Sequence, residues 1–583
     1  MSKLNSLFLI ILLLFPNFAL AIQTDDSRAF VITNVNLIPM DSERILKHQT
    51  VIIKNGRIDK IGLTGKVKIP QGAKVIDGTN QYLMPGLTDM HIHIWDTEDL
   101  MLYLANGVTT VRNMWGKPQH LEWKKKIATG ELFSPTIYTA GDILDGENPI
   151  WRASRAITNP DEARKIVTEE ANDGYDFIKV YSKLTPENFA AILESAKKNN
   201  IKVAGHVPWA VDLETALKSG MHTLEHLYGY DTYLETKDSP VRGKVDSWSR
   251  TLRFQHIDES RISQIARMTK ESGVWITPTL VVFQKNLPPD EARKILNQPV
   301  IKFVRPELVS SWDAERGAKL TSDDLNAIRT ADKMRKKIVK ALYESDAPIL
   351  LGTDSLNDFV LPGYAIHEEL RNLVEAGLSP FEAIKAGTVN AAQALGKFDE
   401  FGTISVGKRA DLLLLSGNPL QKIENISLLN GVMVRGKWMT KSDLQADLDG
   451  LGKLFEREAR IRESALGGSP EQIRNVYEKS KTDNSERVFR ETMMNSLGYQ
   501  LLREKKNEQA IEVFKLNTLE NPKSANAADS LSEAYEKLGS NELAIEYAEK
   551  ALQLLPDDAS LDSRRRDVVT NSAKNRIERL KKK

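Results

Sequence analysis

The sequence predicts an α/β protein whose largest part is a (β/α)8 TIM barrel, a closed ring of parallel strands surrounded by helices. Three observations predict this fold class. Short apolar runs alternate with helical ones through the middle of the chain. Side chains able to bind metal stand at the downstream ends of several runs, where such barrels carry their functional groups. Two β-rich blocks flank this middle part, and a charged helical region follows them.

Residues 1–21 are predicted to form a secretory signal peptide. Lys3 gives a positive start, Leu7–Phe15 is apolar, and Ala19-Leu20-Ala21 offers small residues for cleavage. A membrane anchor needs about 20 apolar residues, and Pro16 interrupts this run well before that length. We therefore expect cleavage after Ala21 and a periplasmic or secreted protein with no membrane span after signal cleavage.

Composition narrows the possible partners and metal ligands. The 583 residues include 80 Lys and Arg against 79 Asp and Glu, so no charge excess indicates nucleic acid as a partner. The chain has no cysteine, which excludes disulfides, thiolate ligands and cysteine nucleophiles. Any metal ion must bind His, Asp, Glu or a modified Lys, and these ligands suit zinc and similar divalent ions.

The two β-rich blocks, residues 22–84 and 397–445, are predicted to pair into one small β-sandwich. Each contains short strand-like runs separated by polar turns. The strand candidates are Ala29–Ile38, Thr50–Ile58 and Lys74–Gly78 in the first block, and Ala410–Leu415 and Asn430–Trp438 in the second.

The barrel is predicted to span residues 85–396, because strand-like and helical runs alternate there as in βα units. The eight strand candidates are Leu87–His93, Val108–Met114, Thr136–Gly141, Phe177–Tyr181, Lys202–Val207, Thr223–His226, Val274–Leu280 and Pro348–Asp354. The helix candidates include Pro186–Asn199, Leu213–Ser219 and Asp324–Ser345. Two long connections, Gly229–Phe254 and Val281–Ala347, either cover the active site or decorate the surface.

Residues 446–583 are predicted to form a helical region with an internal repeat. Asn507-Glu508 recurs as Asn541-Glu542, and Leu497 recurs as Leu531, with an offset of 34 residues. This period resembles that of tetratricopeptide repeats. Two uses of such a region stay open: it binds a protein partner, or it only packs on the barrel.

Six side chains fall at or next to the predicted downstream strand ends. They are His91, His93, Lys179, His206, His226 and Asp354. Because residues two apart in an extended chain share a face, the first two imidazoles can reach one ion. His222 competes with His226 but stands at the start of its strand, the wrong end for this site. Asp89 is a candidate for orienting one of the first two histidines.

Lys179 ends an apolar strand, where a charged side chain is costly. Burial favours its neutral amine, which can capture carbon dioxide as a carbamate whose two oxygens can bridge two cations. The alternative is a lysine that pairs with an acid or points into solvent.

In combination, these motifs resemble those of the amidohydrolase superfamily, in its imidazolonepropionase-related and dipeptidase-like branch. The shared stretches are Pro-Gly-Leu-x-Asp-x-His-x-His ending at His93, Ile-Lys-Val-Tyr, Gly-His-Val-Pro, Glu-His-Leu and Gly-Thr-Asp. The resemblance covers residues 29–440 and does not include the helical repeats.

The resemblance implies a site with two divalent metal ions, usually Zn²⁺. His91, His93 and Asp354 would hold one ion, and His206 and His226 the other. Lys179, carrying carbon dioxide as its carbamate, would bridge them, and its presence favours the two-metal branch.

A water shared by two cations becomes a hydroxide nucleophile near neutral pH. Asp354 would accept its proton and return it to the leaving amine as general acid. Tyr228 either donates a hydrogen bond to the developing oxyanion or only packs in the interior. Arg112, Trp115 and His367 are further candidates for contact with substrate.

These inferences predict an exported, metal-dependent amidohydrolase that cleaves a C–N bond in a small molecule such as a dipeptide or an N-acyl amino acid. A lactonase or phosphoesterase on the same site is one alternative, because the activated water does not dictate the electrophile. A non-catalytic periplasmic scaffold acting through its helical repeats is another.

Overall fold

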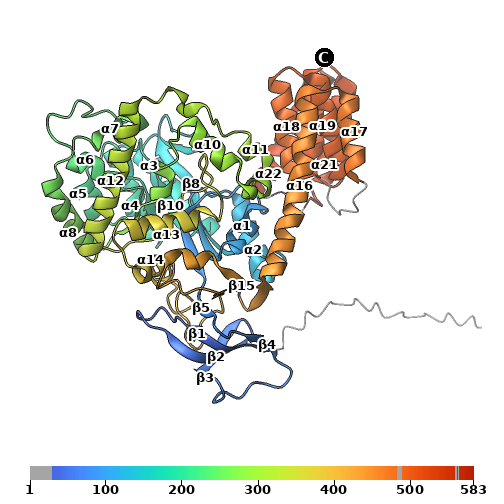
Figure 1. Cartoon of the computed structure of the whole chain (residues 1–583). Coiled ribbons are helices and arrows are strands. Elements are labelled where there is room, and N and C mark those ends of the chain that lie inside the picture. Colours follow the sequence, from blue (N-terminus) through green and yellow to red (C-terminus); the bar gives the residue numbers. More distant parts are fainter. Residues whose placement is uncertain (1–28, 482–488, 559–560, 562, 583) are drawn as a thin grey trace, which may run out of the picture.

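The computed structural model describes residues 29–481, 489–558, 561 and 563–582. The predicted signal segment, residues 1–21, lies outside these residues. Within them, no helix combines the length and the apolar character needed to cross a bilayer. A barrel, a flanking sheet and a helical region make up the described chain (Figure 1).

The barrel is a nearly closed ring of seven regular parallel strands, which confirms the predicted fold class. In spatial order they are β6 (Leu87–Ile92), β7 (Val108–Asn113), β8 (Thr136–Gly146), β10 (Phe177–Val180), β11 (Lys202–Gly205), β12 (Thr223–Glu225) and β13 (Trp275–Thr277). A short strand, β9 (Arg155–Ile157), pairs with the end of β8.

The predicted eighth strand, Pro348–Asp354, does not form a regular strand. Single parallel bridges join Ile349 to Ile276 on one side and Ser355 to Ile92 on the other. The segment therefore fills the gap between β13 and β6 without a continuous ladder. Its backbone turns at Asp354, whose φ of 59° lies outside the β region.

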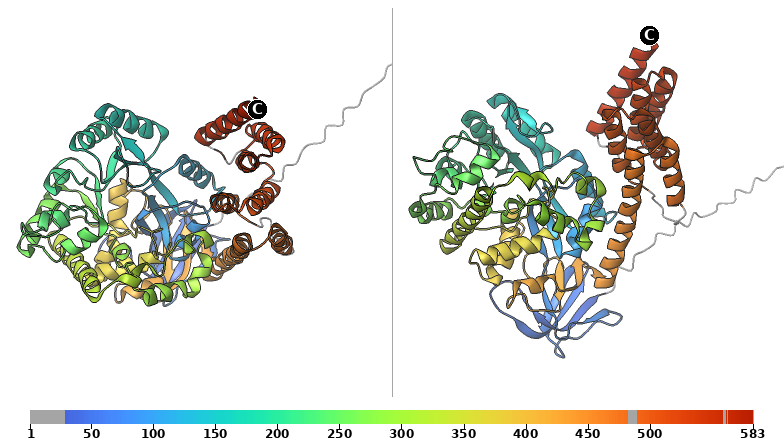
Figure 2. Two further views of the ribbon diagram at one scale, coloured as in Figure 1. Left: turned by 90° about the horizontal axis from the view of Figure 1, so that it is seen from above. Right: turned by 45° about the horizontal axis from the view of Figure 1, so that its top comes forward.

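Helices follow the barrel strands and cover the outside of the ring (Figure 2). They are α1 (Asp99–Ala105), α2 (Pro118–Thr129), α3 (Pro160–Asp173), α4 (Pro186–Lys198), α5 (Leu213–Lys218), α8 (Ile262–Ser272), α12 (Ser322–Glu344), α13 (Ala365–Glu375), α14 (Pro380–Ala386) and α15 (Val389–Leu395). The side chains of Thr185 and Asp212 cap α4 and α5 by accepting backbone N–H bonds. Three of these helices match the predicted ones to within about two residues.

The two long connections contain short helices. The first carries α6 (Tyr230–Leu234) and α7 (Ser247–Arg253), and the second begins with α9 (Leu280–Phe283), α10 (Pro289–Leu296) and α11 (Pro306–Val309). Three 3₁₀ turns complete the described helical elements of the barrel and its insertions: η1 (Glu259–Arg261), η2 (Pro299–Phe303) and η3 (Arg316–Lys319). Another, η4 (Ile423–Ser427), lies in the second flanking block.

The two flanking blocks pair with each other, as predicted, and form one continuous sheet. Its order is β16 (Lys437–Thr440), β15 (Leu429–Val434), β14 (Leu412–Leu415), β5 (Tyr82–Pro85), β1 (Phe30–Leu37), β2 (Leu46–Lys54) and β3 (Arg57–Leu63), with β4 (Lys74–Asp77) also beside β1. The antiparallel pair β14–β5 joins the two blocks. Buried side chains such as Ile32, Val51 and Leu412 form the core of this sheet.

The C-terminal region is entirely helical in its described residues. It contains α16 (Lys441–Gly467), α17 (Pro470–Ser480), α18 (Glu491–Arg503), α19 (Asn507–Glu520), α20 (Ala525–Lys537), α21 (Asn541–Leu554) and α22 (Ser563–Lys581). Helices α20 and α21 begin and end 34 residues after α18 and α19, so the helix pair recurs with the period of the sequence repeat.

One arginine ties this helical region to the barrel. Arg490 is fully buried, and its guanidinium donates to Glu458 of α16, Asp96 after β6 and Glu307 of α11. Thr492 also donates to Asp96, at 2.9 Å. Helix α16 packs against α1 and η2. The helical region is thus joined to the side of the barrel rather than tethered by a loose linker.

Candidate active site

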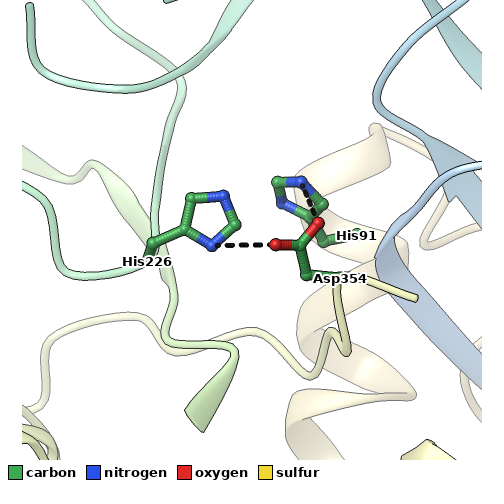
Figure 3. Close-up of side chains that lie close together, drawn as sticks. All are labelled: His91, His226 and Asp354. Atoms are coloured by element: carbon green, nitrogen blue, oxygen red, sulfur yellow. Dashed lines mark ion pairs between the residues drawn. The ribbon is translucent and has the colours of Figure 1, made fainter. Parts of the chain in front are cut away.

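Strand β6 and the segment that closes the barrel bring His91, His93 and Asp354 together. The His93 Nε2 lies 3.0 Å from Asp354 Oδ1, and the His91 Nε2 lies 3.5 Å from the same oxygen. The His226 Nδ1 lies 3.8 Å from the other carboxylate oxygen, Asp354 Oδ2 (Figure 3). Ligand atoms of His91, His226 and Asp354 all lie within 4.8 Å of one another, a spacing that suits a metal ion.

The ends of β11 and β12 add His206 and His226. Their ring centroids are 5.0 Å apart, and His226 lies 4.5 Å from the His91 ring. The Ser182 hydroxyl lies 2.9 Å from His206 Nδ1, and the Thr279 hydroxyl lies 2.7 Å from His226 Nδ1. These contacts fix both rings and leave each Nε2 for another partner.

Lys179 lies on β10 with only 1% of its surface exposed. Burial lowers the pKa of its amine to about 8. Its Nζ lies 6.0 Å from the ring centroid of Tyr181, and that ring lies 4.0 Å from the ring of His206. After burial itself, the charge of Lys179 helps to hold the pKa values of His91 and His206 well below their usual range. The structure therefore places the lysine among the imidazoles, inside the barrel.

Glu225 is a buried residue of this cluster that sequence reasoning missed. Its Oε2 accepts from His91 Nδ1 at 2.7 Å, and its Oε1 accepts from Arg112 at 2.7 Å. Because a carboxylate accepts the Nδ1 proton, His91 keeps its Nε2 lone pair for a metal ion. The signal in the sequence was an acid directly before His226 in an apolar strand.

Two expectations about neighbouring residues are wrong. Arg112, expected to contact substrate, is fully buried and donates to Met90 O, Thr223 and Glu225, so it supports the cluster from inside the barrel. Asp89, expected to orient an imidazole, instead accepts the backbone N–H of His91 and bonds Thr353. It thereby joins β6 to the closing segment.

His222 lies away from the cluster, as the choice of His226 required. Its Nε2 lies 2.7 Å from the Ala394 carbonyl oxygen, and its ring stacks on Phe177. His367 lies on α13, and burial lowers its pKa to about 4. Among the described residues it makes no ring contact with the clustered imidazoles.

Aromatic side chains surround the mouth of the cluster. Tyr228 lies edge-on to His206, with ring centroids 4.5 Å apart. Trp115 packs edge-on against His93 at 6.4 Å, and its indole contacts Trp95 at 5.2 Å and Trp151 at 6.0 Å. These tryptophans, which we call the indole wall, border the site beside His93.

The residues present fit a metal ion. His91 Nε2 and His93 Nδ1 are buried without a hydrogen-bond partner in the described structure, which is costly unless a ligand completes them. Burial also lowers the pKa values of His91, His206 and His226 well below their usual range, which keeps these imidazoles in the neutral form that binds metal. Neutral imidazole and carboxylate donors suit zinc and similar divalent ions.

The backbone around these side chains carries strain. Asp354 and His226 adopt left-handed conformations, with φ of 59° and 65°, although neither is glycine. Such residues cost on the order of 1–3 kcal/mol each and concentrate at functional sites. Strain at both residues supports a functional rather than a structural role for the cluster.

Comparison with known proteins agrees with this geometry. Residues 82–439 match the family model described as "Amidohydrolase family". The ochratoxinase of Aspergillus niger is 23% identical over 470 residues, covering 69% of this chain and 84% of that protein. The 5-methylthioadenosine/S-adenosylhomocysteine deaminase of Caldanaerobacter subterraneus subsp. tengcongensis is 25% identical over 411 residues, covering 67% and 84%.

The solved structure of the bottromycin amidohydrolase superposes with a TM-score of 0.61 at 25% identity, covering 73% of this chain and 92% of that one. The family model spans more than half of the chain and includes every clustered side chain. The chain therefore belongs to the amidohydrolase family and is a hydrolase that acts on carbon–nitrogen bonds.

Proposed function

We propose that the protein hydrolyses the C–N bond of a small-molecule amide, such as a dipeptide or an N-acyl amino acid, with two divalent metal ions. One observation carries this proposal. Four imidazoles, one carboxylate and one buried amine converge at the downstream end of the barrel, and two of the imidazole nitrogens have no hydrogen-bond partner among the described residues.

The proposed ligands are His91, His93 and Asp354 for one ion and His206 and His226 for the other, with zinc as the expected metal. When bound, such ions act as Lewis acids that polarise a carbonyl and activate water. Glu225 and Ser182 contact the Nδ1 atoms of His91 and His206, so the Nε2 atom of each ring would be the one that binds an ion.

Lys179 is proposed to join the two halves of the site as a carbamate. Its neutral amine would add to carbon dioxide, forming an N–C bond and releasing one proton. The lowered pKa of this amine, about 8, favours the neutral form that this addition needs. The product is an anion with two oxygens, a bridge that an ordinary lysine does not offer.

Asp354 is proposed to move the proton. Burial raises the pKa of its carboxyl group, but the neighbouring His226 and His93 outweigh burial and hold that pKa below its usual value. The group is therefore ionised at neutral pH and can accept a proton from water. It would return this proton to the departing amine. Tyr228, beside His206, can donate a hydrogen bond from its hydroxyl group to the developing oxyanion.

Purified protein supplied with zinc and bicarbonate tests the proposal against libraries of dipeptides, N-acyl amino acids, lactones and phosphoesters. We expect metal-dependent release of an amine from at least one amide class, and about two ions per chain by metal analysis. Turnover of lactones or phosphoesters alone would replace the proposal with the corresponding esterase activity. A chain that binds no metal would favour a scaffold.

Export and a partner for the helical region also stay proposals. The apolar N-terminal run supports a secretory signal, and hence a periplasmic or secreted enzyme. The 34-residue recurrence of the helix pairs supports tetratricopeptide-like repeats that could hold a protein partner. Detection of the mature N-terminus at Ile22 in the exported fraction would test the first of these.

A further inference from the structure

A small cavity adjoins the candidate metal centre on the side of His226. Its volume is about 40 Å³, room for a few water molecules or one carboxylate. The residues that matter for its chemistry are His226, Tyr228, Arg250, Phe254, Phe283 and Arg335. The long connections and α12 supply the last four of them, so the cavity lies where these segments meet the barrel end.

Arg335 is the most unusual residue of this cavity. It projects from α12, is only 6% exposed, and lies with its guanidinium 3.8 Å from the Phe283 ring centroid and 4.4 Å from that of Phe254. Among the described residues, no carboxylate forms an ion pair with it. Aromatic faces stabilise a guanidinium only in part. The cost of burying this charge is therefore not offset by an ion pair, and a bound anion would lower it.

Arg250 adds a second positive charge. Its guanidinium lies 3.4 Å from the ring centroid of Tyr228, and its Nε is 3.9 Å from Asp231. That carboxylate already accepts a hydrogen bond from Arg253 at 2.6 Å. Asp231 is the one acidic group among the cavity's described lining residues. The side chains that line the cavity therefore carry a net positive charge, which favours an anionic ligand.

The position of this charge relative to the reacting bond suggests its ligand. In an N-acylated amino acid the α-carboxylate is attached to the carbon next to the scissile nitrogen. A receptor for that carboxylate must therefore lie directly beside the metal ligands, and His226 lines both the metal centre and the cavity. Guanidinium groups bind carboxylates through two parallel N–H bonds, which gives geometric as well as charge selectivity.

Aromatic side chains border the other side of the centre, and Lys117, the one cation over the Trp115 ring among the described residues, already pairs with Asp142. The rings of His93, His91 and His226 follow one another at 5.6 and 4.5 Å, so the cavity and the indole wall border opposite ends of this row. The uncharged indoles suit the acyl half of a substrate. The arginines suit its acidic half.

We propose that Arg250 and Arg335 bind the α-carboxylate of the amino acid released by hydrolysis, so that the enzyme acts on N-acyl amino acids or dipeptides with a free carboxylate rather than on neutral amides. This inference rests on the proposed amide hydrolysis and assigns to these two residues the selection of its substrates.

Matched substrates test it directly. N-Benzoyl-L-leucine and N-benzoyl-3-methylbutylamine differ only in the carboxylate, and analogous pairs can be made for other side chains. We expect the wild-type enzyme to prefer the acids by at least about 100-fold in kcat/KM, since a site built for a charged group rejects analogues that lack it. Arg335→Met and Arg250→Met should each lower kcat/KM for the acids about 10- to 100-fold and change that for the amines less than about 3-fold.

Two further variants separate a receptor from a structural role. Arg335→Lys keeps the charge and should recover part of the preference for acids. Arg261→Met removes a guanidinium that stacks on Tyr233 in the same insertion but does not line the cavity, and should change neither substrate class. Calorimetric binding of free L-leucine, which should weaken in both arginine-to-methionine variants, reports on the receptor without turnover.

The possible failures are distinguishable. Acids and amines cleaved equally well by wild type, with both affected alike in the variants, would overturn the carboxylate receptor and leave amide hydrolysis standing. Cleavage of neither class by zinc-loaded enzyme, across all pairs tried, would overturn the proposed function and this inference with it.

Discussion

The candidate metal cluster and the cluster around Arg490 are both buried and charged, yet they are completed differently. Arg490 donates to Glu458, Asp96 and Glu307, and none of these four side chains has an unpartnered buried atom in the described structure. In the metal cluster, by contrast, His91 and His93 each keep a buried ring nitrogen without a hydrogen-bond partner among the described residues. The first cluster is complete within the chain, and the second requires a ligand.

This difference separates groups that hold the fold from groups that do chemistry. Breaking a complete buried ion cluster leaves uncompensated charge and destabilises the fold. Removing a side chain whose partner is a ligand lowers ligand binding and turnover instead, because the fold does not depend on that side chain. Arg335 is buried without an ion-pair partner among the described residues. By the same reasoning it resembles the metal cluster, which requires a ligand, rather than Arg490, which holds the fold.

The largest effect is expected for Lys179→Ala. Loss of the proposed bridge should remove at least one ion and lower kcat/KM more than about 1000-fold, with partial rescue by small carboxylic acids, while the thermal midpoint of the metal-free protein changes little. Metal content, turnover and calorimetry together measure this. Lys202→Ala, which removes a lysine from the neighbouring strand β11, serves as the matched control. Full activity of Lys179→Ala would exclude a carbamate bridge.

Arg490→Met should show the opposite pattern. Three carboxylates would lose their shared cation, and the free energy of unfolding should fall by about 3–5 kcal/mol, measured by urea denaturation at neutral pH. Turnover per folded molecule should change far less. Arg503→Met, at an exposed position at the end of α18, the helix that follows Arg490, provides the control. A variant as stable as the wild type would mean that the cluster does not hold the helical region.

A smaller effect is expected for Ser182→Ala. This change removes the hydroxyl beside His206 Nδ1 but leaves every proposed ligand in place. Metal affinity should fall about 10- to 100-fold, with activity restored by excess zinc. Ser195→Ala, whose hydroxyl bonds a backbone carbonyl on the outer helices, should keep wild-type affinity. Unchanged affinity in Ser182→Ala would show that the ring orientation of His206 is set by packing alone.

An effect that depends on pH is expected for Glu369, a buried carboxyl group that accepts the backbone N–H groups of Leu280 and Val281 at 2.8 Å. Burial raises its pKa from 4.5 to about 8. An acid whose pKa is higher in the folded state favours folding in its protonated form. Its contribution is therefore complete below about pH 4.5 and is lost as the pH rises through about 8.

Stability of the wild type should therefore fall relative to Glu369→Gln by up to about 1.4 kcal/mol per pH unit in this window. Unfolding of both proteins across the window measures this difference. Parallel curves would show that Glu369 keeps one protonation state throughout.

Sequence reasoning predicted the barrel and its strand ends, because these depend on local periodicity and on the rule that parallel strands end together. The same rule selected six side chains for one site, and their role as metal ligands stays a prediction. It missed Glu225 as the partner of His91, and it assigned Arg112 to the substrate, because an ion pair inside a barrel joins residues far apart in sequence. Arg490 and Asp96 are 394 positions apart, and no local pattern links them.

The eighth strand shows a different limit. Pro348–Asp354 has the apolar composition of a strand, but its backbone leaves the ladder at Asp354. Propensity did not reveal that a strained turn would present this carboxylate. The backbone conformation at Asp354 serves the position of its carboxylate in the site rather than hydrogen bonding in the sheet.

Helix α16 has a consequence for how the two ends of the chain cooperate. It begins at Lys441, directly after β16 ends at Thr440, and its 27 residues span roughly 40 Å as one rigid rod. With Arg490 as a second attachment, the rod gives the C-terminal helices a fixed distance and bearing from the barrel. A molecule bound to those helices would be held at a fixed position relative to the catalytic opening. Lengthening α16 by a single turn would both shift and rotate that binding position.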